Sequence, residues 1–312
     1  MATMKAIRMH AYGGPEVLKY EDAPRPEPAA GEVLVRVHAA AINPVDWKIR
    51  EGYMKPFRDY PLPLILGWDF SGVVDSAGSG VSEWKAGEAV YGRPDISRDG
   101  SYAEYIAVKA SEIARKPASL DHVHSAAIPL AGLTAWQAIF DVGGLTAGQR
   151  ILIHAAAGGV GTFAVQLAKW KGAYVIGTAS ASNHGFLREL GADEIVDYQT
   201  TRFEDVVHEV DVVLDSMAGE TRKRSWQVLK KGGILVSILG PPSREEAAAH
   251  GVRAGSVFVQ PNAQQLGELA KLADSGKLRP IVEAVLPLRE AARAQEMNQT
   301  LHTRGKIVLE VV

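Results

Sequence analysis

A turn of small residues lies between an apolar run and a segment with helical spacing. It reads Ala156-Ala157-Gly158-Gly159-Val160-Gly161 and follows the apolar residues 151–153. This order of strand, turn and helix is what a dinucleotide-binding motif requires. Gly158 would let the backbone approach a pyrophosphate, and Gly161 would let the helix pack closely on the strand. The helix N-terminus would offer N–H groups to the phosphates.

The motif is one glycine short of the pattern G-x-G-x-x-G, because Ala156 stands at its first position. A tight turn in an α/β protein that binds no nucleotide would look the same, so the motif alone is weak. The candidate cofactor-binding residues of the turn are Ala157, Gly158, Gly159, Val160 and Gly161.

Composition limits the function classes. The chain has 312 residues, of which 46% are hydrophobic and 22% charged, and this predicts about two folded domains. A net charge of −2 gives no reason to expect a nucleic-acid or membrane partner. No apolar run reaches the ~18 residues of a membrane span, and the N-terminus lacks the apolar core of a signal peptide. We therefore expect a cytoplasmic protein.

The chain contains no cysteine. This excludes a disulfide framework, a thiol nucleophile and a cysteine-ligated zinc or iron–sulfur site. The chemistry must come from a bound cofactor or from oxygen and nitrogen side chains.

Residues 1–125 are rich in short β patterns separated by glycine and proline, which favours a barrel or sandwich. One of them alternates, with Val33, Val35 and Val37 on one face. The expected strands are 5–10, 18–22, 32–41, 72–78, 88–92 and 102–108, with one or two helical turns in 43–52.

From residue 126 apolar runs alternate with helical patterns, which is typical of a doubly wound parallel sheet. The runs are 150–156, 173–179, 194–198, 210–216, 234–240 and 255–260, and the expected helices are 126–143, 162–171, 183–190, 221–231 and 244–250. A helix near 263–275 follows, and then a strand, 306–312, that we expect to return to the N-terminal unit.

Four motifs occur in a fixed order: Ala155-x-x-Gly158-x-x-Gly161, Val165 to Lys169, Leu190 to Asp193, and Arg304 to Leu309. Together with the β-rich N-terminal part, they resemble the medium-chain dehydrogenase/reductase superfamily and, within it, the zinc-free quinone oxidoreductases (zeta-crystallin-like). The resemblance implies a Rossmann NADP-binding domain, 126–261, and a GroES-like substrate domain, 1–125 with 262–312. It also implies a homodimer, the common state in this family.

In zinc-dependent members of the superfamily, a cysteine, a Gly-His-Glu motif and a later cysteine or aspartate hold the catalytic metal. The resemblance places Asn43 at the cysteine and Gly67-Trp68-Asp69 at the Gly-His-Glu motif. Tryptophan is no zinc ligand, and Asp69 without imidazole or thiolate partners is a poor site. We therefore expect no catalytic metal.

The end of the second strand of the doubly wound sheet indicates which cofactor binds. Enzymes that prefer NAD usually place a carboxylate there for the ribose 2′-hydroxyl. Here residues 175–184 contain none, whereas Ser180 and Asn183 can donate hydrogen bonds to a phosphate, so NADPH is favoured over NADH. The same two residues could instead cap the helix expected at 183–190.

The resemblance also implies further cofactor contacts. A tyrosine and a C-terminal arginine at the 2′-phosphate match Tyr198 and Arg304, with Arg188 or His184 as a further basic group. The remaining candidates near the ribose, the nicotinamide or its carboxamide are Thr134, Thr178, Ser237, Gly240, Phe258 and Val259. Thr134 could instead bond its own helix backbone.

With neither metal nor thiol, the cofactor would carry the chemistry and pass a hydride to a quinone or an α,β-unsaturated carbonyl. Asn43 could donate a hydrogen bond to the developing oxygen anion. Lys48 could donate a hydrogen bond or a proton, oriented by Asp46. The two residues could equally form a surface ion pair, with the proton coming from solvent. Tyr53 and Trp68 could line an apolar substrate pocket or merely fill the core.

Two other function classes stay open at this point. One is a non-catalytic NADPH-binding protein with a structural or redox-sensing role, and the other is a zinc alcohol dehydrogenase, which the missing ligands oppose. An enoyl-thioester reductase is a variant of the favoured reaction.

Overall fold

The computed structural model describes residues 2–312, and its contacts divide the chain into two units. Unit 1 comprises residues 2–130, 260–276 and 280–312, and unit 2 comprises 131–259 and 277–279. The chain crosses between units after Leu130 and Val259, near the predicted boundaries at 125 and 261, and again after Gly276 and Arg279.

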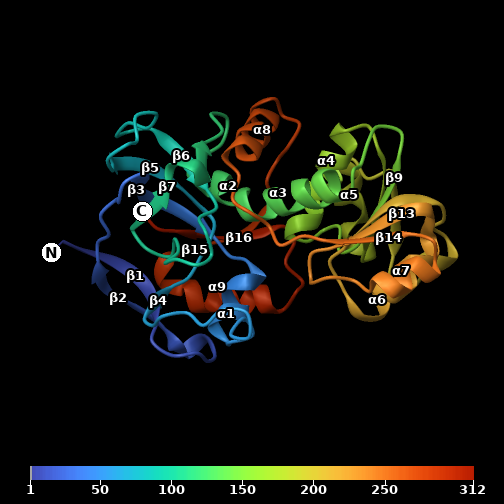
Figure 1. Ribbon diagram of the computed structural model, residues 1–312, viewed down its shortest axis with the longest axis horizontal. Helices are drawn as coiled ribbons and strands as arrows, with labels where there is room; N and C mark the ends of the chain where they lie inside the picture. Colours follow the sequence, from blue (N-terminus) through green and yellow to red (C-terminus); the bar gives the residue numbers. More distant parts are fainter. Residues whose placement is uncertain (1) are drawn as a thin grey trace. The chain divides into compact units, whose positions relative to one another are not determined.

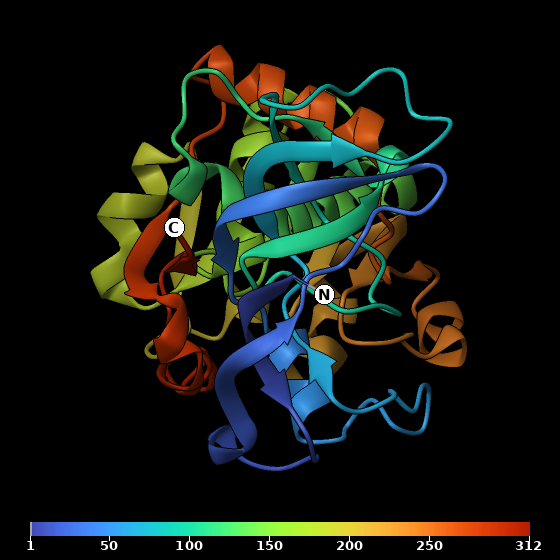
Figure 2. The same ribbon diagram turned by 90° about the vertical axis from the view of Figure 1, so that its left-hand side faces the viewer.

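Unit 1 contains two sheets (Figure 2, blue to green strands together with two red C-terminal strands). The smaller is antiparallel, in the order β2 (Leu18–Pro24), β1 (Thr3–Met9) and β4 (Leu64–Ile65). The larger contains β15 (Val282–Pro287), β16 (Lys306–Glu310), β3 (Glu32–Ala41), β5 (Phe70–Ala77), β6 (Ala89–Gly92) and β8 (Ile113–Arg115) in that order, with β7 (Tyr105–Lys109) paired to β3. Because β16 pairs antiparallel with β3, the last strand returns to the N-terminal strands, as predicted.

The helices of unit 1 are α1 (Pro44–Arg50), α2 (His122–Ala126), α8 (Ala263–Asp274) and α9 (Ala291–Gln299). Helix α9 packs against α1 and β16, whereas α8 packs against β8. Pro44 begins α1, where its missing N–H costs nothing. Helix α9 and strand β15 were not expected from the sequence.

Unit 2 is built on one six-stranded parallel sheet (Figure 1). Its strands are β11 (Glu194–Asp197), β10 (Tyr174–Ala179), β9 (Arg150–Ile153), β12 (Val210–Asp215), β13 (Leu229–Ser237) and β14 (Arg253–Ser256), in that order across the sheet. Its helices are α3 (Pro129–Trp136), which begins in unit 1, the π-helix Gln137–Val142, α4 (Gly159–Trp170), α5 (His184–Glu189), α6 (Gly219–Ser225) and α7 (Arg244–Ala249). Helices α4 and α5 lie on one side of the sheet, and α6 and α7 on the other (Figure 1). The predicted doubly wound sheet and the separate β-rich unit are both confirmed.

One expected helix is too long. The sequence predicted 221–231, but α6 ends at Ser225 and β13 begins at Leu229. The reason is tertiary, because Leu229 is paired with Val210 of β12. Single-turn 3-10 helices complete the secondary structure at Pro15–Val17, Ala110–Glu112, Ala181–Asn183, Phe203–Asp205, Trp226–Val228 and Leu288–Glu290.

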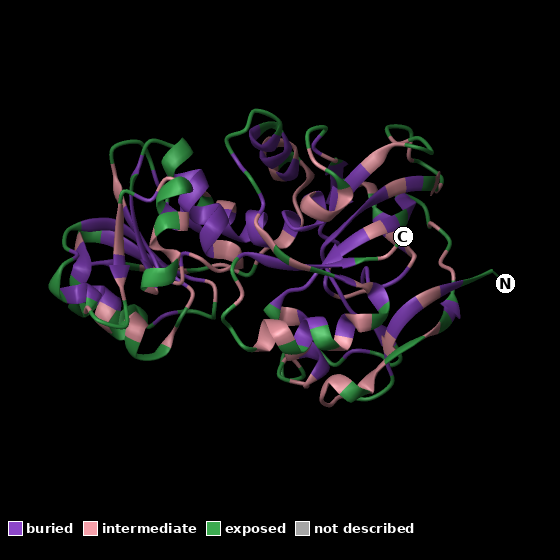
Figure 3. Ribbon diagram, turned by 180° about the vertical axis from the view of Figure 1, so that it is seen from behind, coloured by how far each residue is buried: buried purple, intermediate pink, exposed green. Residues whose placement is uncertain are grey.

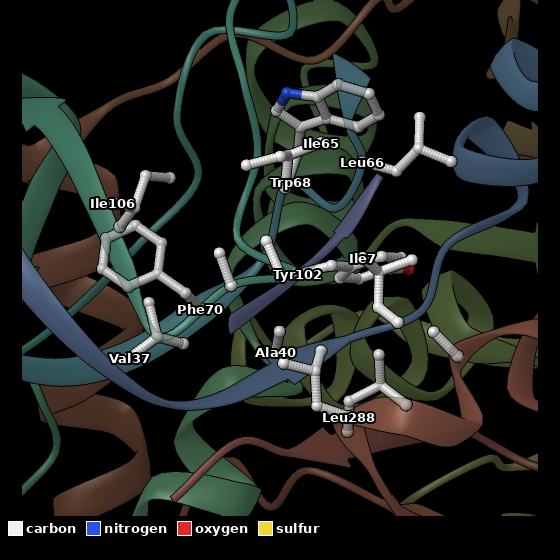
Figure 4. Packing of buried hydrophobic residues seen from close by; sticks show 14 of the residues in the cluster. Ile7, Val37, Ala40, Ile65, Leu66, Trp68, Phe70, Tyr102, Ile106 and Leu288 are labelled. Carbon is white, nitrogen blue, oxygen red and sulfur yellow. The ribbon is translucent and has the colours of Figure 1, made fainter. Parts of the chain in front are cut away.

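In each unit the buried positions follow the strands, and the exposed ones lie on loops and outer helix faces (Figure 3). Val33, Val35 and Val37 of β3 are fully buried, as predicted, but Leu34 between them is buried as well, so the alternation holds only around the exposed Arg36. In unit 1 the ring of Trp68 lies by Ile65 and Leu66 within this core (Figure 4).

Candidate active site

The glycine turn joins β9 to α4 in unit 2. Gly161 is required by close approach, because a Cβ atom there would lie 2.3 Å from the carbonyl oxygen of Ala155. Ala155 itself has φ of 48°, a left-handed conformation unusual for a residue other than glycine. The turn is therefore tightly constrained at two of its residues.

Helix α4 begins without a side-chain cap, since its N-cap is Gly158. An α-helix leaves its first N–H groups without intrahelical acceptors, so those of Gly159, Val160 and Gly161 are available to an anion. A dinucleotide pyrophosphate fits this arrangement, because the turn presents backbone donors that no side chain caps.

A buried histidine lies beneath the turn. His154 follows β9 and is 1% exposed, with Nε2 2.9 Å from Ser225 Oγ and Nδ1 3.2 Å from Thr178 Oγ1. Ser225 donates its only hydroxyl hydrogen to the carbonyl of Thr221, so it must accept from Nε2. Nδ1 is then an acceptor for the hydroxyl of Thr178, whose oxygen accepts from the amide of Ala155. This chain of hydrogen bonds requires a neutral histidine and ties the turn to α6.

The stability of the protein should therefore depend on pH through His154. Burial lowers the pKa of His154 to about 4, reinforced by Arg224 and opposed by Asp215 and Glu204. As pH falls below about 6.5, the unfolded chain takes up a proton that the folded protein refuses. Above that pH the stabilisation that depends on neutral His154 is fully present. Towards about pH 4 the free energy of unfolding should fall by up to about 3 kcal/mol.

Urea unfolding near neutral pH and at about pH 4.5 measures this loss in the wild type and in His154→Gln, which cannot titrate. We expect the variant to be less stable at neutral pH but to lose clearly less on acidification. Equal losses in the two proteins would show that other groups cause the acid sensitivity.

The end of β10 holds the candidate phosphate residues. Ser180 and Asn183 precede the helical turns at Ala181–Asn183 and α5, yet neither side chain accepts a capping hydrogen bond, so the capping alternative is wrong. Instead Asn183 Nδ2 lies 3.1 Å from Ser180 Oγ. Nε2 of the neighbouring His184 is buried without a hydrogen-bond partner among the described residues. These polar groups are consistent with a phosphate ligand.

The other cofactor candidates lie in different environments. Thr178 and Ser237 are buried and already bonded, Ser237 to the guanidinium of Arg222 at 2.7 Å. Thr134 is buried in α3, whereas Tyr198 and Phe258 are exposed.

The last candidates lie on loops and on a helix surface. Gly240 and Val259 follow β13 and β14 in unit 2, and Arg188 is exposed on α5. Arg304 is exposed in unit 1, where its amide donates to Glu283.

The residues that match the zinc-ligand positions of zinc-dependent relatives form a buried polar cluster in unit 1. Asn43 is 2% exposed and Asp69 is fully buried, and Asn43 Nδ2 donates to Asp69 Oδ2 at 2.8 Å. The second N–H of this amide is directed at the carbonyl of Ala41, 3.4 Å away. Asn43 would have to release one of these acceptors to bind a substrate oxygen.

The cation of this cluster is Lys306, which β16 brings to it. Its ammonium donates to the carbonyl of Ile42 at 2.9 Å, to Asp69 Oδ2 at 3.2 Å and to Asn43 Oδ1. An ammonium has three N–H groups, so Lys306 is fully satisfied. Burial raises the pKa of Asp69, and the Lys306 ammonium opposes this rise.

This donor set does not fit a catalytic zinc ion. The oxygens of Asn43 and Asp69 that could face a metal are bonded to the Lys306 ammonium, and Trp68 supplies no ligand atom. Among residues 2–312 no three histidine, cysteine, aspartate or glutamate side chains are placed to share a metal ion.

Asp46 belongs to the same cluster rather than to Lys48. It is fully buried, and its Oδ2 accepts from the amide of Asn43 at 2.7 Å and the hydroxyl of Tyr102 at 2.6 Å. Burial raises the pKa of Asp46 to about 7. The expected pairing of Asp46 with Lys48 is therefore wrong, because the carboxyl group lies in the core.

The three residues predicted to contact the substrate, Lys48, Tyr53 and Trp68, differ in burial. Lys48 is half-buried on α1, and burial lowers its pKa. Tyr53 is 63% exposed, with its ring 6.3 Å from that of Trp47. Trp68 is fully buried in the hydrophobic core and donates to the carbonyl of Arg98, so the structure favours the core alternative for it.

Two buried polar residues of the candidate site were not predicted from the sequence. Lys306 was visible only as part of the motif Arg304 to Leu309, and nothing local links it to Asp69, 237 residues away. His154 stands two residues before the glycine turn, and this position in the sequence could have indicated it.

Two family models match the chain, the alcohol dehydrogenase GroES-like domain over residues 29–118 and the zinc-binding dehydrogenase over 190–309. The NAD(P)H oxidoreductase RTN4IP1, mitochondrial, of Danio rerio is 35% identical, covering 90% of this chain and 84% of that protein. The NADPH-dependent alkenal/one oxidoreductase, chloroplastic, of Arabidopsis thaliana is 36% identical, covering 98% of this chain and 79% of that one.

Similarity extends to solved structures. The quinone oxidoreductase from Coxiella burnetii has a TM-score of 0.92 and 38% identity, with 100% of each chain covered. Within residues 2–312 no helix has the length and apolar character needed to cross a membrane.

Proposed function

Because the chain belongs to the medium-chain dehydrogenase/reductase family, in its quinone oxidoreductase branch, we propose that it reduces quinones or α,β-unsaturated carbonyls with NADPH. The chain is an oxidoreductase that uses a nicotinamide cofactor and acts on a small molecule. NADPH rather than NADH, and reaction without a metal, are the finer parts of the proposal. The observation that carries the metal-free part of the proposal is the Lys306 ammonium, which is bonded to the oxygens that would face a metal.

The chain's own residues have distinct tasks in this reaction. The amides at the start of α4 would hold the pyrophosphate, and Ser180 with Asn183 would hold the 2′-phosphate. When bound, the cofactor supplies a hydride. Lys48 is the candidate proton donor, because burial lowers its pKa and so makes its ammonium a stronger acid.

Further assignments are part of the same proposal. Thr134, Phe258 and Val259 would contact the nicotinamide side of the cofactor, and Tyr198 and Arg304 the phosphate side. A cytoplasmic location and a homodimer remain predictions for this chain, and some of its relatives are mitochondrial or chloroplastic by name.

Cofactor preference is tested by titrating the protein with NADPH and NADH while following tryptophan fluorescence. We expect NADPH to bind at least about tenfold more tightly, since charge-assisted hydrogen bonds to its 2′-phosphate are absent with NADH. Ser180→Asp places a carboxylate at the end of β10 and should reverse the preference by charge repulsion. Equal affinities in the wild type would overturn the assignment of Ser180 and Asn183.

The reaction is tested by following NADPH absorbance with quinones, enones and enals. Turnover that survives a chelator, with no zinc retained through purification, supports the metal-free reductase. Tight NADPH binding without oxidation by any acceptor would favour the non-catalytic alternative. One equivalent of retained zinc would contradict the metal-free reaction.

A further inference from the structure

Arg93 is a buried arginine that the protein leaves unpaired. It is 2% exposed, and its Nε is buried without a hydrogen-bond partner. Neither a salt bridge nor a hydrogen bond joins its guanidinium to any residue from 2 to 312. Burying a charged group whose N–H donors find no acceptor costs on the order of several kcal/mol, so such a residue is seldom kept for stability.

The position of Arg93 follows from the strand register. It comes directly after β6, where Gly92 pairs with Phe70, so the next residues along the two strands are Arg93 and Asp69. Arg93 therefore lies beside the polar cluster of Asn43, Asp69 and Lys306.

The charged groups around Arg93 are all engaged elsewhere. Asp69 accepts from Leu130, Asn43 and Lys306, and the carboxylates of Asp95 and Glu112 accept backbone amides. They influence Arg93 through space, as does the nearby Tyr60, without bonding to it. The guanidinium keeps its N–H donors available while negative charge surrounds it.

These surroundings define the ligand. Asp69, Asp95 and Glu112 would repel an anion, whereas a neutral carbonyl oxygen accepts hydrogen bonds without adding net charge. We propose that Arg93 binds the carbonyl oxygen of a neutral quinone or enone substrate. This rests on the proposed function and supplies it with a group that fixes the substrate oxygen.

The role also fits the course of the reduction. When the reduced nicotinamide gives a hydride to the β-carbon of an enone, it is oxidised and the π electrons move onto the carbonyl oxygen. The resulting enolate takes up one proton, for which Lys48 is the candidate donor. The oxygen is more negative in the transition state than in the substrate, so a guanidinium bonded to it stabilises the transition state more strongly.

The test replaces Arg93 by methionine and by lysine, with Arg115→Met as the matched control. Arg115 is exposed on β8, where it pairs with Glu88 and lies over the ring of Trp84. With menadione or methyl vinyl ketone as acceptor, we expect Arg93→Met to lower kcat/KM by about 100-fold and Arg93→Lys by less. NADPH affinity should be unchanged in all three variants.

Thermal unfolding separates this role from a structural one. Removing an unpaired buried charge should leave the Tm of Arg93→Met equal to or above that of the wild type. Wild-type kcat/KM in Arg93→Met would overturn the proposal, whether or not the Tm of the variant is lowered.

If the wild type turned over no acceptor, the proposed function would be refuted, but the assignment of Arg93 would still be testable. Binding of menadione without cofactor, followed by fluorescence quenching, then provides the test. Weaker menadione binding in Arg93→Met than in Arg115→Met would still support the assignment of Arg93, and equal binding would overturn it.

Discussion

Lys306→Met is expected to lower the free energy of unfolding by about 3–5 kcal/mol. Among residues 2–312 Lys306 is the one cation bonded to Asp69, so the substitution leaves a fully buried carboxylate that accepts from Asn43 and the Leu130 amide. The oxygen of Asn43 and the carbonyl of Ile42 lose their donor as well. Urea unfolding at neutral pH measures the effect.

The chain offers a matched control and a compensating variant. Lys271→Met removes an exposed lysine that pairs with Glu268 on α8, and it should change the free energy of unfolding by less than about 1 kcal/mol. Adding Asp69→Asn to Lys306→Met removes the unpaired charge and should recover part of the loss. If Lys306→Met unfolded like the control, the ammonium would not be what compensates Asp69.

Gly161→Ala should remove most cofactor binding. The new Cβ would lie 2.3 Å from the oxygen of Ala155 and 2.7 Å from the carbonyl carbon of Ala156, so backbone rather than a side chain would have to move. We expect NADPH affinity to fall at least tenfold, about 1.4 kcal/mol, and the free energy of unfolding to fall by about 1–3 kcal/mol. Fluorescence titration and urea unfolding measure the two effects.

Gly185→Ala is the control in the same unit, because no atom lies within 4 Å of the Cβ it would add. It lies in α5, where alanine favours helix over glycine by about 1 kcal/mol, so the variant should be at least as stable as the wild type and bind NADPH equally. NADPH binding by Gly161→Ala at wild-type affinity would show that the close approach of α4 to the turn is not required.

The elements could be predicted where a local pattern decides them. The alternation of Val33, Val35 and Val37 and the small residues before α4 each reflect a periodicity or a steric need that is visible in the sequence. The end of α6 could not be predicted, because pairing of Leu229 with Val210 converts an ambiguous apolar segment into strand.

The polar cluster was predicted only in part. Asn43 and Asp69 were placed together by resemblance, but their cation comes from the last strand, far away in sequence. The buried place of Trp68 was equally hidden, because an indole suits a pocket wall and a core alike. Residues whose partners come from distant strands are the ones that local patterns cannot identify.

The return of β16 to β3 has a consequence for synthesis on the ribosome. Asp69 emerges 237 residues before Lys306, so the carboxylate is made long before the ammonium that compensates it. Unit 2 is almost contiguous in sequence and can pack as soon as it has emerged. The first strands to be made therefore belong to the unit that is completed last.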